Sequence, residues 1–110
     1  MTPDPRLNDL AKISAVLRDA KLMALSKAAD EKALVEAALQ ALGDTVISPA
    51  STAPEAMAFI MHETWKTQKR RALNQILAQK TAVWLQAQED ARHAFGRAEV
   101  LAKLVERSGS

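Results

Sequence analysis

The side chains best suited to chemistry are two histidines, His62 and His93. They stand 31 residues apart in one predicted helix, about 46 Å along its axis, so they cannot share a metal ion. The chain has no cysteine, and its residue spacing assembles no Ser-His-Asp triad, carboxylate pair or glycine-rich loop. We therefore expect no metal, no cofactor and no enzyme activity.

A run of basic residues stands next to Trp65: Lys66, Lys69, Arg70 and Arg71. Residues 64–88 contain five bases and no acid, a balance that favours an acidic partner. On a helix the four bases spread over roughly 200° of the circumference, whereas a major-groove reader concentrates them on one face. We interpret the run first as solvated helix surface, second as a contact for an acidic protein, and least as a nucleic-acid site.

Start and stop signals divide the chain into two helices of unequal length. Asp4 is an N-cap before Pro5 at the first helical position, and Gly43 ends the pattern as a C′ glycine. Thr52 and Glu55 then form a predicted capping box. We expect one all-α domain over residues 1–110, with a helix over about 5–42, a connector over 43–52 and a longer helix over about 53–107.

The apolar residues predict that the two helices form an antiparallel coiled-coil hairpin. The stripe expected in the first helix is Leu7, Leu10, Ile13, Leu17, Ala20, Ala24, Ala28, Val35, Ala38 and Leu42. In the second helix apolar residues recur every eleven positions, as in Met61, Ala72, Val83, Ala94 and Val105. An eleven-residue repeat predicts a straight or weakly right-handed pairing.

A tight fold at the connector sets the predicted register. It places Ile13 opposite Val83, and it leaves polar seam positions at Glu31 beside Trp65, at Lys69 and at Lys80. Trp65 and Trp84 are expected to pack in or beside the seam, with Trp65 partly exposed. In this register residues 91–107 extend beyond the start of the first helix. Because a lone helix with an apolar face is marginally stable, we expect a partner to cover this end.

Two further features leave a choice open. Gly96 inside a helix costs about 1 kcal/mol relative to alanine, so it marks either neutral drift on an exposed face or a close approach of another backbone. Val46 and Ile47 in the connector either fold back against Leu42 and Met57 or form an exposed docking knob, and we favour the fold-back.

The segment Phe95-Gly96-Arg97-Ala98-Glu99-Val100-Leu101-Ala102-Lys103-Leu104 follows a long alanine- and glutamine-rich helix. It resembles the C-terminal part of the flagellar export stalk proteins of the FliJ type, which are related to stalk components of type III secretion systems. Leu17-Arg18-Asp19-Ala20-Lys21-Leu22 in the first helix is compatible with this family. The resemblance implies a two-helix rod that sits in the ring of the export ATPase and contacts the export gate and substrate chaperones.

These features predict a non-enzymatic coiled-coil adaptor for protein export. We expect it to be cytoplasmic or peripheral at a membrane export apparatus, without membrane insertion. The residues expected to bind partners are Phe95, Arg97, Leu101, Leu104, Lys66, Lys69, Arg70 and Arg71. A homo-oligomeric structural coiled coil is the alternative, and a nucleic-acid-binding hairpin is the least favoured one.

Overall fold

The first helix begins where Asp4 caps it. The computed structural model describes residues 4–46 and 51–109, and α1 spans Pro5–Gly43. The Asp4 carboxylate accepts a hydrogen bond from the N–H of Arg6 at 3.0 Å, which satisfies one of the free donors at the helix start. The predicted N-cap and the position of Pro5 are therefore confirmed.

Hydrogen bonds from Thr45, and not a glycine in the left-handed conformation, cap the end of α1. Gly43 is the last helical residue, and no described glycine has a positive φ, so its prediction as a C′ glycine is wrong. The Thr45 hydroxyl donates to the carbonyl of Ala41 at 3.0 Å, and the Thr45 N–H donates to the carbonyl of Leu42 at 3.3 Å. These bonds satisfy carbonyls that the last turn would otherwise leave free.

The second helix, α2, spans Ala53–Ser108 and starts with a modified capping box. The Thr52 hydroxyl accepts from the N–H of Glu55 at 3.3 Å, as predicted. The Glu55 carboxylate instead reaches Ser51, where it accepts from the hydroxyl at 2.6 Å and from the N–H at 2.9 Å. The cap is confirmed, but it reaches one residue further back than the sequence pattern indicates.

The two helices pack against each other as an all-α helical hairpin, without a strand in the described residues. Both helix ranges agree with the prediction to within a residue. The contacts divide the chain into two compact units, which we call the first unit (residues 1–29 and 83–110) and the second unit (residues 30–82). Each helix contributes one segment to each unit.

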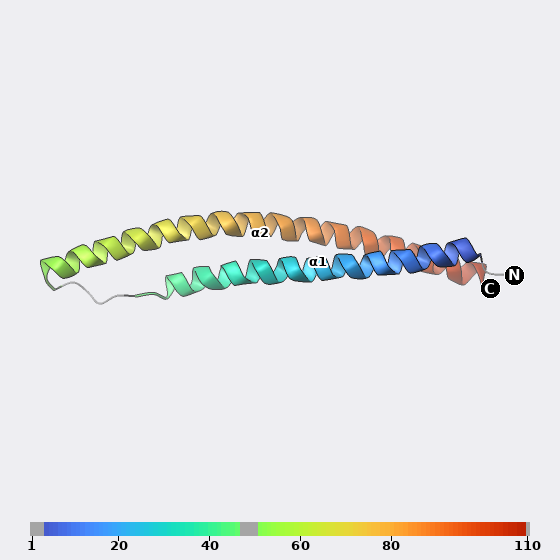
Figure 1. The fold of residues 1–110 in the computed structure, drawn as a ribbon, viewed down its shortest axis with the longest axis horizontal. Coiled ribbons are helices and arrows are strands. Elements are labelled where there is room, and N and C mark those ends of the chain that lie inside the picture. Colours follow the sequence, from blue (N-terminus) through green and yellow to red (C-terminus); the bar gives the residue numbers. More distant parts are fainter. Residues whose placement is uncertain (1–3, 47–50, 110) are drawn as a thin grey trace. The chain divides into compact units, whose positions relative to one another are not determined.

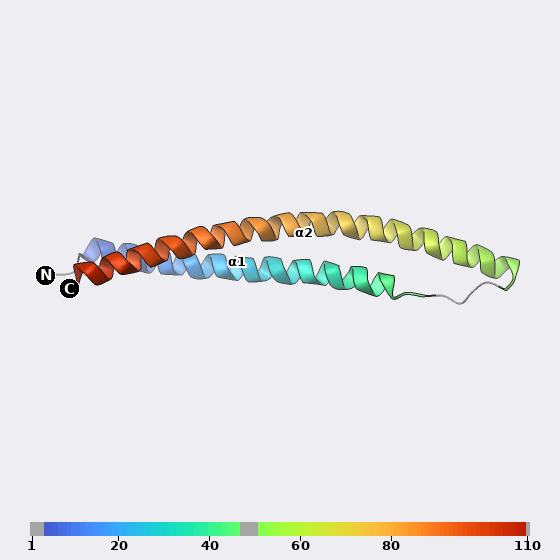
Figure 2. The ribbon, with the colours of Figure 1, turned by 180° about the vertical axis from the view of Figure 1, so that it is seen from behind.

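In the first unit, the start of α1 lies beside the end of α2 (Figures 1 and 2). Ala91, Ala94 and Ala98 are only 4%, 5% and 7% exposed, and the Arg18 guanidinium lies 5.9 Å from the centre of the Phe95 ring. The prediction that residues 91–107 extend beyond the first helix is therefore wrong. The chain's own first helix packs along one side of them, the side of Ala91, Ala94 and Ala98.

In the second unit, two contacts show the register. Lys80 Nζ lies 3.3 Å from a carboxylate oxygen of Glu31, and Lys66 Nζ donates to the carbonyl of Thr45 at 2.8 Å. Positions rise along α1 as they fall along α2, so the pairing is antiparallel. Lys80 is confirmed as a polar seam position, whereas the predicted placement of Glu31 beside Trp65 is wrong, and Lys69 is exposed rather than in the seam.

The predicted register is wrong by roughly four to five helical turns. The sequence interpretation paired Ile13 with Val83, whereas Arg18 actually lies against Phe95. The surplus turns of α2 therefore precede Lys66, and residues 53–65 are exposed except for Ala56 and His62, which are half-buried. The tight return assumed at the connector does not occur, because side-chain packing between the helices, and not connector length, fixes the register.

The seam follows a seven-residue pattern with alternating steps of three and four. In α1 the buried and half-buried positions include Leu7, Ala11, Ser14, Arg18, Lys21, Leu25, Ala28, Lys32, Val35, Leu39 and Leu42. In α2 they include Leu73, Leu77, Lys80, Trp84, Ala87, Ala91, Ala94, Ala98, Leu101, Val105 and Ser108. This spacing is typical of left-handed pairs, so the predicted eleven-residue seam is wrong.

The eleven-residue pattern exists, but it does not follow the seam. Met61, Ala72 and Val83 are exposed, whereas Ala94 and Val105 lie in the seam. An eleven-residue repeat drifts around the helix relative to a seven-residue one, so it starts on the outer side of α2 and reaches the seam only near its end. The expected stripe of α1 is displaced too, because Leu10, Ile13 and Leu17 are exposed.

Ala94 and Ala72 provide a matched test of the seam, since both belong to the eleven-residue pattern and only Ala94 is buried. We expect Ala94→Leu to lower the free energy of unfolding by about 1–3 kcal/mol, because a larger side chain forces the helices apart. Ala72→Leu should change it by less than about 0.5 kcal/mol. Urea denaturation followed by circular dichroism measures both. Equal losses would contradict the observed seam.

The cap of α2 should depend on pH through Glu55. Hydrogen bonds from the Ser51 hydroxyl and then the Ser51 N–H hold the pKa of Glu55 below its usual value of 4.5. Since the folded-state pKa is depressed, the stabilisation is present above that usual value and is lost as pH falls through the lowered pKa. In Ser51→Ala the pKa of Glu55 should rise towards 4.5, measured by NMR titration. An unchanged pKa would show that the hydroxyl has no such effect.

Candidate functional site

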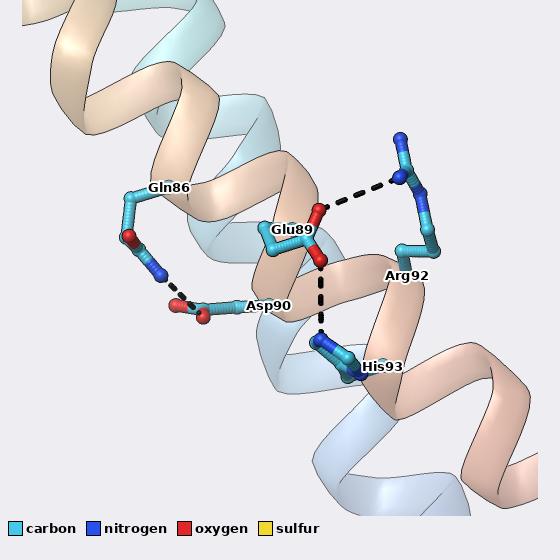
Figure 3. Close-up of polar contacts among 5 residues, drawn as sticks. All are labelled: Gln86, Glu89, Asp90, Arg92 and His93. Carbon is cyan, nitrogen blue, oxygen red and sulfur yellow. Dashed lines mark hydrogen bonds and ion pairs between the residues drawn. The ribbon is translucent and has the colours of Figure 1, made fainter.

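His93 belongs to a polar cluster on the exposed side of α2 (Figure 3). Its Nε2 lies 3.1 Å from Glu89 Oε1, and Arg92 Nη1 lies 3.4 Å from Glu89 Oε2. Gln86 donates from Nε2 to Asp90 Oδ1 at 2.9 Å. These are contacts between residues three or four apart on one helix, which each stabilise it by about 0.2–0.5 kcal/mol. They form no nucleophile–base pair.

His62 lies far from this cluster in the sequence and belongs to the second unit. Its ring packs on Trp65 with 5.8 Å between centroids and a tilt of 32°. Its Nε2 is shielded from solvent and has no hydrogen-bond partner in the described part of the chain. Trp65 is half-exposed, as predicted. Residues 4–46 and 51–109 contain no group of three or more side chains that could hold a metal ion.

The surface carries shallow hollows of different chemistry. One of about 430 Å³ on α1 is lined by Lys12, Ile13, Val16, Leu17 and Ala20. Another of about 390 Å³ on α2 is lined by Phe59, Ile60, Glu63, Thr64, Thr67, Gln68 and Arg71. A smaller one of about 180 Å³ in the first unit is lined by Leu17, Lys21, Asp90, His93, Ala94 and Arg97. The first hollow is apolar except for Lys12. An apolar hollow of this kind suits the docking of another apolar surface.

The four partner-binding residues predicted near the C-terminus do not share one surface. Arg97 and Leu104 are exposed and seven residues apart, so they lie on the same side of α2. Leu101 is half-buried in the seam. Phe95 is 43% exposed but lies beneath Arg18, on another side of the helix. Of the four, only Arg97 and Leu104 lie on one exposed side of α2.

The basic run belongs to the second unit and is divided as well. Lys66 is half-buried and donates to the carbonyl of Thr45, so it has a role within the fold. Lys69, Arg70 and Arg71 are exposed. Successive residues of a helix point about 100° apart, so these three cations face different directions. The arrangement suits a solvated surface or an acidic protein better than a nucleic-acid groove.

Gly96 stands in open space. A Cβ built on it would meet no atom within 4 Å, so no other backbone in the described chain approaches it closely, which agrees with an exposed and neutral position. In the connector, Val46 is 84% exposed, and the predicted fold-back against Leu42 and Met57 is wrong for this residue. Ile47 lies outside the described residues.

The apolar side of α1 was not predicted as a surface. Leu10, Ile13, Val16, Leu17 and Met23 are exposed, although three of the five positions were expected in or near the seam. A count of seven-residue spacings would have shown a second candidate stripe in this helix, two positions from the seam residues: Ile13, Val16, Ala20 and Met23. Within residues 10–23 the larger apolar side chains face away from α2, whereas Ala11 and Ser14 face it.

Comparison with known proteins finds no match to this chain among protein-family models, curated proteins or solved structures. Over the described residues, neither helix contains an apolar stretch that could cross a membrane. The surface that the two helices present is therefore the evidence for function.

Gly96 provides a test of the exposed side of α2. Gly96→Ala should raise the free energy of unfolding by roughly 1 kcal/mol, because alanine has the higher helix propensity and its Cβ meets nothing. The matched control is Ala102→Gly at another exposed position of α2, which should lower it by a similar amount. Thermal denaturation measures both. A destabilised Gly96→Ala would indicate a close approach at this position.

Proposed function

We propose that this protein is a non-enzymatic helical-hairpin adaptor that binds other proteins, of the kind found in the stalk of flagellar and type III export ATPases. One observation carries the proposal. No described large side chain is fully buried, while large apolar side chains of both helices are exposed. Exposed apolar surface beyond isolated residues is typical of protein-binding sites.

The link to an export stalk rests on the resemblance of residues 95–104 to that family and on the helical hairpin itself. The proposal gains no support from an unpaired C-terminal helix end, because α1 packs along the Ala91, Ala94 and Ala98 side of that end. What supports a contact there is the exposed pair Arg97 and Leu104, a cation and an apolar side chain on one side of α2. Such a pair suits a partner surface that is apolar with an acidic edge.

Point substitutions test this proposal better than truncation. Removal of residues 91–110 would take away Ala91, Ala94 and Ala98, against which α1 packs, so the first unit would lose its fold. Arg97 and Leu104 can be changed without altering the seam, since both side chains are exposed. Leu101 is unsuitable because it is half-buried.

We expect Arg97→Glu combined with Leu104→Ala to reduce capture of the export ATPase from the same organism by roughly tenfold or more. The loss follows from charge reversal and the removal of apolar contact at one exposed site. Purified components in a quantitative pull-down, with helicity checked by circular dichroism, give the measurement.

The matched control is Arg92→Glu. This arginine has a 77% exposed side chain on the same helix and forms an ion pair with Glu89, so its reversal should leave capture unchanged. Failure of the wild-type protein to bind the ATPase, gate or chaperones would overturn the export-stalk proposal. Equal losses for Arg92→Glu would show a non-specific charge effect and would also contradict the proposed contact.

A further inference from the structure

The apolar side of α1 in the first unit is a continuous uncovered surface. Ile13, Val16 and Met23 are 64%, 69% and 74% exposed, and Leu17 is 37% exposed. Together with Ala20 they cover three turns of the helix, and all of them except Met23 line the hollow of about 430 Å³. We call these five residues the α1 face.

The α1 face has a fixed orientation. Ser14 and Ala28 are buried on the seam side of the same helix, 6% and 4% exposed, which sets the rotation of α1 about its axis. The seam is already occupied by α2, so the α1 face points away from it. The face is therefore a second, preformed apolar surface, and ordering costs little when it binds a partner.

Opposite charges stand at the two ends of this face. Asp9 precedes it and Lys27 follows it, eighteen residues or about five turns apart, so both lie on the side of Val16 and Ala20. Neither makes an ion pair within the described chain. Along the side of Val16 and Ala20 the order is thus an acid, the apolar residues and then a base, with Lys12 at the edge of the hollow.

We propose that the α1 face binds a second copy of this chain, with the two α1 helices antiparallel about a twofold axis at the level of Arg18. Such a pairing places Asp9 of each copy opposite Lys27 of the other. The twofold axis therefore gives two equivalent Asp9–Lys27 pairs, one at each end of the interface. In the same register Ile13 meets Met23 and Val16 meets Ala20, which sets a large side chain against a flexible or small one. Two hairpins then form a four-helix arrangement.

The solvent-exposed area of the chain is large enough for a dimer interface of standard size. The chain exposes 8202 Å² at 12.0 kDa, whereas a compact monomer of that mass exposes about 6,000 Å². The excess is roughly 2,000 Å², and a stable interface of standard size needs about 800 Å² from each partner. One self-contact of that size fits within the excess.

The charge pattern selects a second copy over other occupants. A nucleic acid or an anionic membrane would attract Lys27 but repel Asp9, and a uniformly acidic or basic protein would match only one end. A copy of the same helix in the opposite direction matches both ends by symmetry. This proposal is independent of the export-stalk function, which uses residues of α2.

The first experiment measures self-association of the full chain by sedimentation equilibrium from about 1 to about 100 micromolar. We expect wild-type dimers, and we expect Ile13→Asp to weaken association roughly 100-fold because it buries a charge at each of two equivalent sites. The matched control is Leu34→Asp, which changes a similarly exposed leucine in the second unit and outside the face and should leave dimers intact. Circular dichroism checks that both variants stay helical.

The second experiment tests the direction and register through charge. Asp9→Lys alone places two lysines together, and Lys27→Asp alone places two aspartates together, so each should associate about fivefold more weakly than wild type. A mixture of the two variants should form mixed dimers that recover wild-type affinity. One copy then carries lysine at both positions and the other carries aspartate at both, so opposite charges meet at each end of the interface. The double variant Asp9→Lys with Lys27→Asp should recover it as well.

Each outcome decides the proposal. A wild-type monomer over the whole range would overturn it, and so would a dimer that survives Ile13→Asp, since another surface would then hold it. A dimer that is sensitive to Ile13→Asp but shows no recovery in the double variant would overturn the antiparallel register. Capture of the export ATPase is read separately, so loss of one property leaves the other testable.

Discussion

Close approach of two helices through small side chains is the constraint on which the rest of this structure depends. Ala91, Ala94 and Ala98 are the buried residues of α2, and Ser14 and Ala28 are buried in the part of α1 that shares the first unit. Alanine has high helix propensity and lets helices approach, but it buries little apolar area. Around these alanines the seam therefore fixes the pairing while burying little apolar area, and several large apolar side chains, such as Ile13, Val16 and Met23, remain outside it.

Local signals in the sequence predicted the helices well, and they failed to predict how the helices meet. Asp4, Thr52 and Glu55 act through bonds to residues two to four positions away, so their roles follow from the sequence alone. The register depends instead on contacts between distant segments, as in Arg18 with Phe95. Nearly every turn carries an alanine, so several registers and two stripe positions satisfy an apolar pattern almost equally.

The same ambiguity explains which surface residues sequence analysis found. Trp65, Arg70 and Arg71 are recognisable by residue type and are exposed, whereas Lys69 was expected in the seam and Lys66 is half-buried. Leu101 and the apolar residues of α1 differ from their neighbours only in which way they face, and that depends on the register. The prediction that apolar surface is left for another macromolecule was useful, but it was assigned to the wrong segment. The uncovered surface lies along α1 and at the start of α2.

The opening turns of α2 have a kinetic consequence. Residues 53–65 are held mainly by the backbone bonds of their own helix and by the bonds among Ser51, Thr52 and Glu55. Opening there sacrifices few tertiary contacts, so amide hydrogens in these turns exchange with solvent well before those near Ala94, where both helices must separate. Unwinding of α2 therefore starts at its beginning and proceeds towards the alanine seam.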